Sequence, residues 1–345
     1  MTTKKELYYL PVIDSLRGLA ALMVCIYHFV STTTDFFDPS VRQLFSVGKH
    51  GVQIFFVISG VVIPLSMLKD NYTNKKFPLF FSKRLVRIEP PYLVSLILVI
   101  AYTYIRNFVP GVNPVDLTPH PRDILYHIGY LVPFFKEAHW LTPVYWTLAI
   151  EFQYYLLISI ILPLILKVQW SRGCVIFLLL ISSALVKSPA FIFAWLPLFI
   201  MGIYSALYLT GRVKKIEFLL QVAFCFSAHS VIYSLSDAMF ALGTVCVIIL
   251  FPYFNSKTGK FFGKISYSLY LLHSIIGAAV INFMTRYGHT SIEKVLIVIL
   301  GLLITISCSY FFYLFIERPS QTLSKTIKFK GQYKSDKEYH LEVSK

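Results

Sequence analysis

The sequence predicts an all-α, polytopic bundle of membrane helices, and three observations lead to this fold class. Hydrophobic residues make up 56% of the 345-residue chain, and charged residues only 14%, whereas roughly a quarter of the residues in soluble domains are charged. The mean hydropathy is +0.66. Apolar runs recur along almost the whole chain, at the length of about 20 residues that a helix needs to cross a bilayer. The lipid bilayer is therefore the expected environment, and no large soluble domain is expected.

The apolar runs predict ten transmembrane helices in one domain, residues 1–319. The first run is interpreted as a retained helix, because no small-residue cleavage site follows it. The polar, basic residues 320–345 lack apolar periodicity, and we expect a disordered or surface-lying cytoplasmic tail. The ten predicted helices are residues 11–30, 50–68, 88–108, 145–166, 174–187, 189–209, 216–235, 238–254, 265–284 and 292–316.

The positions of Lys and Arg predict the orientation of these helices. An even number of helices places both termini on one side of the membrane. If that side is the cytoplasm, the inner segments hold 23 Lys and Arg residues and the outer segments hold 8. Positive residues are enriched in cytoplasmic loops. Both termini are therefore predicted to be cytoplasmic, in a multi-pass protein of the inner (cytoplasmic) membrane.

The net charge and the positions of the cysteines argue against two kinds of partner, nucleic acids and metal ions. The net charge of +15 comes from loops and the tail, so membrane orientation explains it and no nucleic-acid partner is expected. The five cysteines lie in apolar runs without a ligand spacing, so no metal site is expected. The longest outer connection, residues 109–144, is rich in Pro, His and aromatic residues. It either shapes a substrate entrance or is an ordinary interfacial loop.

The first predicted helix carries three ionisable groups on one face. In "IDSLRGLAALMVCIYHF", Arg17 precedes His28 by eleven positions, which is about 20° more than three helical turns and about 16 Å along the axis. Asp14 falls about 40° from His28 and forms an i,i+3 pair with Arg17. Such groups are costly in lipid unless they face a protein interior. We therefore expect the three groups to line a cleft. Alternatively, Arg17 extends to the lipid headgroups and His28 lies at the membrane interface.

The chemistry of this face suggests a long anionic substrate. Histidine is the natural general base near neutral pH, and the planar guanidinium of Arg binds phosphate oxygens in pairs. A base at one depth and an anion site at another fit an acyl-CoA, whose phosphates and thioester lie at opposite ends of a flexible arm. A transporter of a glycan or small anion, or a structural subunit, would also explain a polar face.

Further candidates lie in other predicted helices. "FSKRLVRIEPPYLVSL" places Lys83, Arg84 and Arg87 at the cytoplasmic edge, where an anion site and the positive-inside rule are both possible explanations. In "PVYWTLAIEFQYYLL", Glu151 lies at the predicted depth of His28, with Tyr155 four residues later. Glu151 is therefore expected either to orient His28 or to form a structural pair.

Two more segments supply polar groups for a cavity. In "VGKHGVQIFFVISGVV", Ser59 can donate a hydrogen bond to a ligand or a neighbouring helix, and the glycines permit close helix packing. In "GKISYSLYLLHSII", Tyr270 and His273 follow one another at about one turn. His273 is interpreted either as a substrate-contacting residue or as a satisfied core histidine.

Six segments taken together resemble a known family. "IDSLRGLAALMVCIYH", "GVQIFFVISG", "SKRLVRIEPPY", "WTLAIEFQYYLL", "GKISYSLYLLH" and "YLFIERP" occur in this order over about residues 11–319. In that order they resemble the motifs of the acyltransferase-3 family of integral membrane acyltransferases. The resemblance implies a bundle of about ten helices that carries an acyl group, usually acetyl, from cytoplasmic acyl-CoA to a hydroxyl on an extracytoplasmic acceptor.

The resemblance also implies residue roles. The family's paired Arg and His map onto Arg17 and His28, with His28 the essential base. Its two-arginine motif maps onto Arg84 and Arg87 at the acyl donor, and its acidic residue onto Glu151, beside Trp146. The expected acceptors are glycans or lipid-linked sugars such as lipopolysaccharide O-antigen, capsule or exopolysaccharide. Since about 29 residues follow the last predicted helix, the additional hydrolase domain of some members is not expected.

The predicted mechanism is direct transfer. Acyl-CoA, most simply acetyl-CoA, serves as a co-substrate and no cofactor is permanently bound. Arg17, Lys83, Arg84 and Arg87 are expected to bind its phosphates. His28, assisted by Glu151 or Asp14, removes the proton of the acceptor hydroxyl, and an acyl-histidine intermediate is the alternative. Trp146, Tyr155, Ser59, His273 and Tyr270 are the expected substrate contacts. The sugar, the length of the acyl group and the oligomeric state are left open by the sequence.

Overall fold

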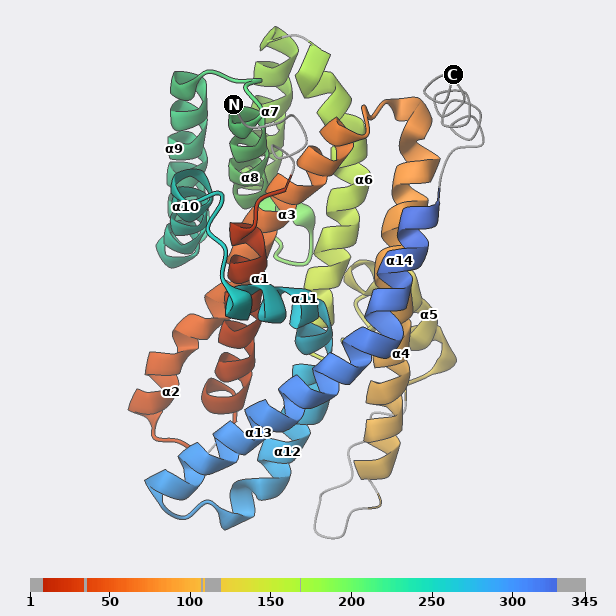
Figure 1. The fold of residues 1–345 in the computed structure, drawn as a ribbon, viewed down its shortest axis with the longest axis vertical. Helices are drawn as coiled ribbons and strands as arrows, with labels where there is room; N and C mark the ends of the chain where they lie inside the picture. The colour runs from red at the N-terminus through yellow and green to blue at the C-terminus, as the bar shows by residue number, and fades with distance from the viewer. Residues whose placement is uncertain (1–8, 34–35, 107, 109–118, 168, 328–345) are drawn as a thin grey trace, which may run out of the picture.

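The computed structural model describes residues 9–33, 36–106, 108, 119–167 and 169–327, and this part of the chain folds into a helical bundle without strands (Figure 1). The α-helices are α1 (Val12–Ile26), α2 (Pro39–Phe45), α3 (Gly51–Lys69), α4 (Phe77–Arg106), α5 (Pro121–Ile128), α6 (Tyr145–Lys167), α7 (Gln169–Leu185), α8 (Leu196–Leu209), α9 (Lys215–Ile232), α10 (Leu235–Leu250), α11 (Lys257–Leu272), α12 (Ala278–Met284), α13 (Ser291–Phe312) and α14 (Arg318–Thr326).

The predicted all-α polytopic bundle is confirmed. Each of the ten predicted runs coincides with helical structure. Within the described residues, eight helical segments are long and apolar enough to cross a membrane, and the apolar helices Arg172–Leu185 and Leu235–Leu250 are shorter. The chain is thus a multi-pass membrane protein, while the side that its termini face stays a prediction.

Several helices differ from their predicted bounds: α11 begins at Lys257 instead of residue 265, and the largest extensions, in α4 and α14, lie at the same end of the bundle. Helix α4 begins at Phe77, eleven residues before the predicted start, because the basic residues that interrupt the apolar run do not interrupt helical hydrogen bonding. The last span continues through α14 to Thr326, past the tail boundary predicted at Ser320. Helix α14 packs along α4, and the remainder of the tail, residues 328–345, lies outside the described residues.

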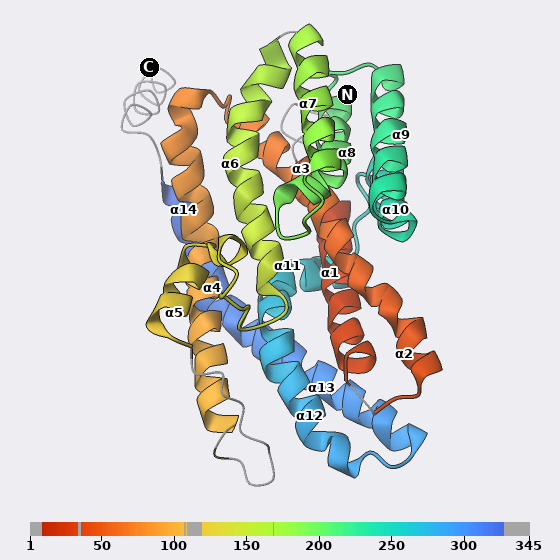
Figure 2. The ribbon, with the colours of Figure 1, turned by 180° about the vertical axis from the view of Figure 1, so that it is seen from behind.

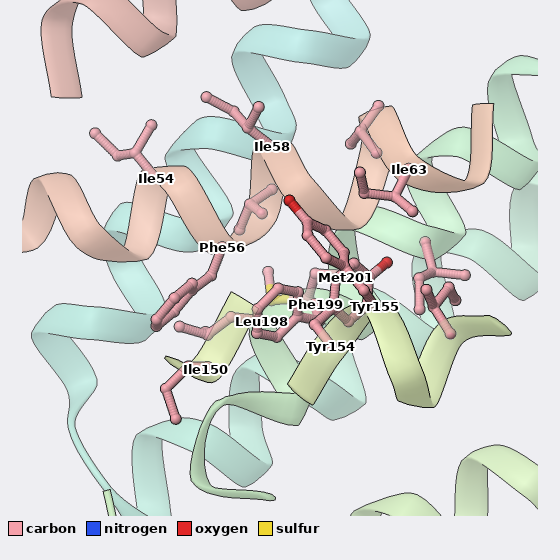
Figure 3. Packing of buried hydrophobic residues seen from close by; sticks show 14 of the residues in the cluster. Ile54, Phe56, Ile58, Ile63, Ile150, Tyr154, Tyr155, Leu198, Phe199 and Met201 are labelled. Atoms are coloured by element: carbon pink, nitrogen blue, oxygen red, sulfur yellow. The ribbon is translucent and has the colours of Figure 1, made fainter. Parts of the chain in front are cut away.

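Buried apolar side chains of α3, α6 and α8 belong to one large cluster. Phe56 of α3 points toward Leu198 of α8 and Ile150 of α6 (Figure 3), and its ring centroid lies 5.0 Å from that of Phe199. Tyr154 of α6 stacks on Phe199 of α8, with ring centroids 4.2 Å apart. Lipid chains are as apolar as these side chains, so the packing is stabilised by van der Waals contact rather than by the removal of apolar surface from water.

Close approach of α3 and α8 depends on two glycines that face each other. A Cβ atom added to Gly202 would lie 2.3 Å from the carbonyl oxygen of Val57, and one added to Gly60 would lie 2.4 Å from that of Phe199. Both clashes are with backbone, which cannot move without displacing a whole helix. The packing role predicted for the glycines of α3 is therefore confirmed.

We expect Gly202→Ala to destabilise the protein by about 1–3 kcal/mol, the usual cost of overpacking a dense interior. Thermal unfolding of the purified protein in detergent measures this effect. Gly243→Ala in α10 is the matched control, because a Cβ atom there meets no heavy atom within 4 Å and alanine favours a helix by about 1 kcal/mol over glycine. Equal melting temperatures for the two variants would contradict the packing argument.

In the described part of the chain, three spans contain a short π-helical turn, a feature that the periodicity of apolar residues does not reveal. The turns are Tyr27–Ser31 after α1, His273–Gly277 between α11 and α12, and Tyr313–Glu317 between α13 and α14. A π-turn inserts an extra residue into the helix, which re-aims the side chains around it, and such turns are frequent at functional sites. Each of the three contains an ionisable residue: His28, His273 or Glu317.

The described part of the connection 109–144 is an ordered element that lies against α4 and α6 (Figure 2). It contains helix α5 and the buried His127, whose Nδ1 donates to the carbonyl oxygen of Asp123 at 2.8 Å. The Nε2 atom accepts a hydrogen bond from the Leu141 backbone at 3.1 Å. Burial lowers the pKa of His127, which favours the neutral ring that this pairing needs. Residues 109–118 lie outside the described residues, and a role at the substrate entrance stays a prediction.

Candidate active site

A polar cavity lies between six spans of the bundle. Its empty volume is about 930 Å³, counting the part open to solvent. Side chains from α1, α3, α4, α6, α11 and the α13–α14 span line it. Seven of the predicted site residues meet here: Arg17, Ser59, Arg84, Arg87, Glu151, Tyr155 and Tyr270.

One wall of the cavity is built around the carboxylate of Glu151. The Tyr155 hydroxyl donates to Glu151 Oε1 at 2.6 Å, and the Ser59 hydroxyl donates to the same oxygen at 3.3 Å. Glu151 and Tyr155 share a face of α6 because they are four residues apart, while Ser59 comes from α3. These hydrogen bonds stabilise an acidic side chain at a depth where it would otherwise be costly.

Three guanidinium groups also line the cavity, and that of Arg84 lies 5.8 Å from the centroid of the Tyr155 ring. Arg84 and Arg87 lie one turn apart on α4, and Arg17 of α1 interacts electrostatically with Arg87, as does Arg84. The Nε atom of Arg17 is buried and has no hydrogen-bond partner among the described residues. Like charges brought together in a protein interior are unfavourable unless an opposite charge joins them. Against these three positive charges the cavity lining holds two carboxylates, Glu151 and Glu317, so one formal positive charge is left in excess and the cluster can accept an anion.

Glu317 belongs to this cluster and was not among the predicted site residues. It is only 3% exposed and accepts hydrogen bonds from the backbone and hydroxyl of Ser268 and, at 2.8 Å, from the Gln321 amide. Its charge interacts with Arg17 and Arg87. An acidic residue at the end of an apolar run is the same signal that identified Glu151, so the sequence contained the information needed to find it.

A second, more basic pocket adjoins the cavity, between the end of α3, the start of α4 and the end of α14. Its empty volume is about 1640 Å³. Six cationic residues and one acidic residue, Asp70, line it; the cationic residues are Lys75, Lys76, Lys83, Arg84, Arg87 and Lys325. Lys83 lies 3.5 Å from Asp70. Arg84 and Arg87 line both spaces, so these two side chains stand where the basic pocket meets the central cavity.

His28 lies beside a second histidine instead of beside a carboxylate. The ring centroids of His28 and His273 are 5.1 Å apart, and the His273 ring is 5.7 Å from that of Tyr270. Tyr270 lines the cavity and shares a hydrogen bond of 2.7 Å with Thr147. The histidine pair is thus connected to the cavity through Tyr270. Glu151, which the sequence suggested might orient His28, instead has the Ser59 and Tyr155 partners described above.

Asp14 and Trp146 are not among the residues that line the cavity, although Trp146 packs edge-on against Phe56, which does line it. Asp14 accepts a hydrogen bond of 2.8 Å from the Tyr9 hydroxyl. Partial burial and the Asp14 carboxylate raise the pKa of Tyr9 to about 12, so this phenol stays protonated and keeps donating. Trp146 packs against Trp195, with ring centroids 5.4 Å apart. The structure therefore brings most of the predicted residues together but gives these two a different neighbourhood.

Comparison with known proteins identifies the family of this chain. A family model described as an acyltransferase domain, of the acyltransferase-3 type, matches residues 10–314. The Staphylococcus aureus (strain COL) protein named "Putative O-acetyltransferase SACOL0978" is 26% identical over 374 residues, which cover 92% of this chain and 58% of that protein. The "O-acetyltransferase OatA" of Staphylococcus aureus (strain NCTC 8325 / PS 47) is 29% identical over 187 residues, covering 50% of this chain and 28% of that protein.

The match to relatives such as SACOL0978 covers most of this chain, but it spans little more than half of the length of those relatives. No solved structure matches it. Because the family model covers most of the sequence, the chain belongs to the acyltransferase-3 family of membrane acyltransferases.

Proposed function

We propose that this protein is an O-acetyltransferase of the cytoplasmic membrane that moves the acetyl group of acetyl-CoA to a hydroxyl of an extracytoplasmic or lipid-linked glycan. The family supports acyl transfer, and the names of the relatives support an acetyl group and an oxygen acceptor. The observation that carries the proposal is the junction of the two cavities at Arg84 and Arg87.

The junction suits the shape of the donor. Acetyl-CoA combines a phosphorylated nucleotide, a narrow pantetheine arm and a thioester. The basic pocket has the charge and size for the nucleotide phosphates, which Lys83, Arg84 and Arg87 would bind. Arginine is suited to this task because its planar group donates two parallel hydrogen bonds to phosphate oxygens. The arm would then pass Arg84 and Arg87 into the central cavity, with the unpaired Nε of Arg17 in reach.

The chemistry assigned to the site is a single displacement. His28 takes the proton of the glycan hydroxyl while the hydroxyl oxygen attacks the thioester carbonyl carbon. The new C–O bond forms and the C–S bond breaks, so the CoA thiolate leaves and the protonated His28 returns its proton to that sulfur. The products are the acetylated glycan and CoA. Glu151, Ser59 and Tyr155 form a polar wall along the path of the arm.

Turnover of labelled acetyl-CoA tests the function. The purified protein, reconstituted in liposomes with lipid-linked glycans from the cell envelope, should release CoA and transfer radiolabelled acetate to the glycan. Mass spectrometry of that glycan should show ester-linked acetyl groups. A transporter, the competing function, would move glycan or anion without releasing CoA. CoA release no faster than in protein-free liposomes, with acceptor and donor both present, would contradict the proposal.

A further inference from the structure

His273 presents a buried hydrogen-bond acceptor that nothing in the described protein satisfies. Its side chain is fully buried, and its Nδ1 atom lies 3.2 Å from the carbonyl oxygen of Leu269. A carbonyl can only accept, so Nδ1 carries the hydrogen and the neutral ring keeps a lone pair on Nε2. Within the described ranges, Nε2 has no hydrogen-bond partner. A buried acceptor without a partner is unfavourable, which calls for an explanation at this position.

The ring of His28, which can donate a hydrogen bond, lies next to the ring of His273. The two ring centroids are 5.1 Å apart and the planes are inclined by 44°. At this separation a ring nitrogen of one imidazole can come within roughly 3 Å of a ring nitrogen of the other, the length of a hydrogen bond. Only a rotation about side-chain bonds of His28 is needed, because both backbones are already in place.

We propose that His273 is the positioning residue for His28: its Nε2 accepts a hydrogen bond from one ring N–H of His28, which leaves the lone pair of the other ring nitrogen available to the acceptor hydroxyl. This inference rests on the proposed function, in which His28 is the base. The usual partner of a catalytic histidine is a carboxylate, which fixes the tautomer and stabilises the protonated ring. Here the neutral imidazole of His273 takes the place of that carboxylate.

The surroundings of His273 support a fixed acceptor. Its ring packs against Tyr270, whose hydroxyl is tied to Thr147 on α6. The next residue, Ser274, shares a hydrogen bond of 2.8 Å with Thr142. The bond to Leu269 and the packing against Tyr270 act on the ring itself, and the Ser274–Thr142 bond anchors the neighbouring residue. An acceptor that cannot turn away selects one tautomer of its partner, which a solvent-exposed or mobile histidine would not do.

Both rings lie at π-turns, which supplies an independent reason for their proximity. His28 is the second residue of the turn Tyr27–Ser31, and His273 is the first residue of the turn His273–Gly277. Helices α1 and α11 pack along each other. Each π-turn changes the direction of one histidine side chain, and the two helices pack closely. Both observations favour a specific histidine pair over a chance contact.

The test compares three variants for acetyl transfer. His273→Phe keeps an aromatic ring against Tyr270 but removes the acceptor, and His273→Gln restores an acceptor oxygen near the former Nε2 position. We expect His273→Phe to lower kcat by about 10- to 100-fold, less than the loss of His28 itself, with the KM for acetyl-CoA within about twofold. His273→Gln should recover activity to within about tenfold of the wild type. His229→Phe, a replacement of another fully buried histidine, is the matched control and should leave kcat nearly unchanged.

The pH dependence of kcat/KM distinguishes a positioning role of His273 from a general loss of structure in the variant. An acceptor on His28 N–H stabilises its protonated form, so the acid limb of the kcat/KM profile should move to lower pH by about one unit in His273→Phe and stay in place in His229→Phe. The rate at which diethyl pyrocarbonate modifies His28, followed by peptide mass spectrometry against pH, should show the same shift without any turnover.

The outcomes distinguish this inference from the proposed function. If wild-type protein transfers acetate and His28→Ala does not, but His273→Phe has the wild-type kcat and pH profile, the positioning role is wrong while the function stands. Equal losses in His273→Phe and His273→Gln with unshifted profiles would also overturn it, because they indicate packing alone. Absence of acetyl transfer by the wild type contradicts the proposed function, and the diethyl pyrocarbonate titration then still tests the contact.

Discussion

His28→Ala is expected to abolish acetyl transfer, with a fall in turnover of about 10²- to 10⁴-fold, the usual contribution of a general base. The side chain is half-buried and its ring contacts Tyr27 and His273, so its removal should leave the helices in place. Release of CoA and labelling of the glycan measure the effect. Size-exclusion chromatography and thermal unfolding in detergent should match the wild type.

His139→Ala is the control for this substitution, because His139 is exposed in the connection before α6 and should tolerate replacement. Normal acetylation of the glycan by His28→Ala would remove His28 from the mechanism. The same variant also tests the alternative chemistry. If an acyl-histidine forms, acid quenching of wild-type protein with donor alone should trap labelled acetate on the peptide that contains His28, whereas direct transfer leaves that peptide unlabelled.

The double variant Arg84→Gln/Arg87→Gln is expected to lower kcat/KM for acetyl-CoA by about 10²-fold or more. Each charge-assisted hydrogen bond to a phosphate contributes roughly 1.5–3 kcal/mol, which corresponds to about tenfold or more for each residue. Most of the loss should appear in KM, because these side chains lie at the junction of the two cavities and are assigned to the donor's phosphates rather than to its reacting carbonyl.

Lys167→Gln/Lys257→Gln provides the matched control, since it removes two exposed positive charges from the predicted cytoplasmic side and should not change KM. Replacement of both arginines by lysine should recover only part of the affinity, because lysine keeps the charge but not the paired donors. An unchanged KM in the glutamine variant would place the donor elsewhere. Acetyl-dephospho-CoA adds a further test: it should bind less tightly to the wild type if Lys75, Lys76 and Lys325 contact the 3′-phosphate.

Much of the fold and the identity of the polar residues could be predicted from the sequence, for one physical reason. Ionisable groups are expensive in lipid, so Arg17, Glu151 and the Arg84–Arg87 pair stand out against apolar runs, and the structure places all four around one cavity. The sequence left open whether Arg84 and Arg87 lie on a helix, because the predicted helix began at residue 88; in the structure α4 starts at Phe77 and continues through Pro90 and Pro91.

The partners of these groups could not be predicted in the same way, because they come from other helices. Ser59 meets Glu151 across 92 residues of sequence, and Glu317 meets Ser268 across 49. The direction in which the His28 side chain points could not be predicted from the sequence either. The angle between Arg17 and His28 was computed for an ideal helix of about 100° per residue, but the helix changes to a π-turn at Tyr27, which no pattern of apolar residues marks.

The guanidinium cluster at the junction of the two cavities has a consequence for the membrane itself. An enzyme that receives its donor from one side and its acceptor from the other needs polar space reaching deep into the bilayer, and such space can leak ions. Fixed positive charge repels protons and metal cations, as it does in selective pores. Arg84 and Arg87 line both spaces and Arg17 lines the central cavity. In the proposed function these charges would admit an anionic donor while opposing cation leakage, so the bilayer would remain an electrical insulator.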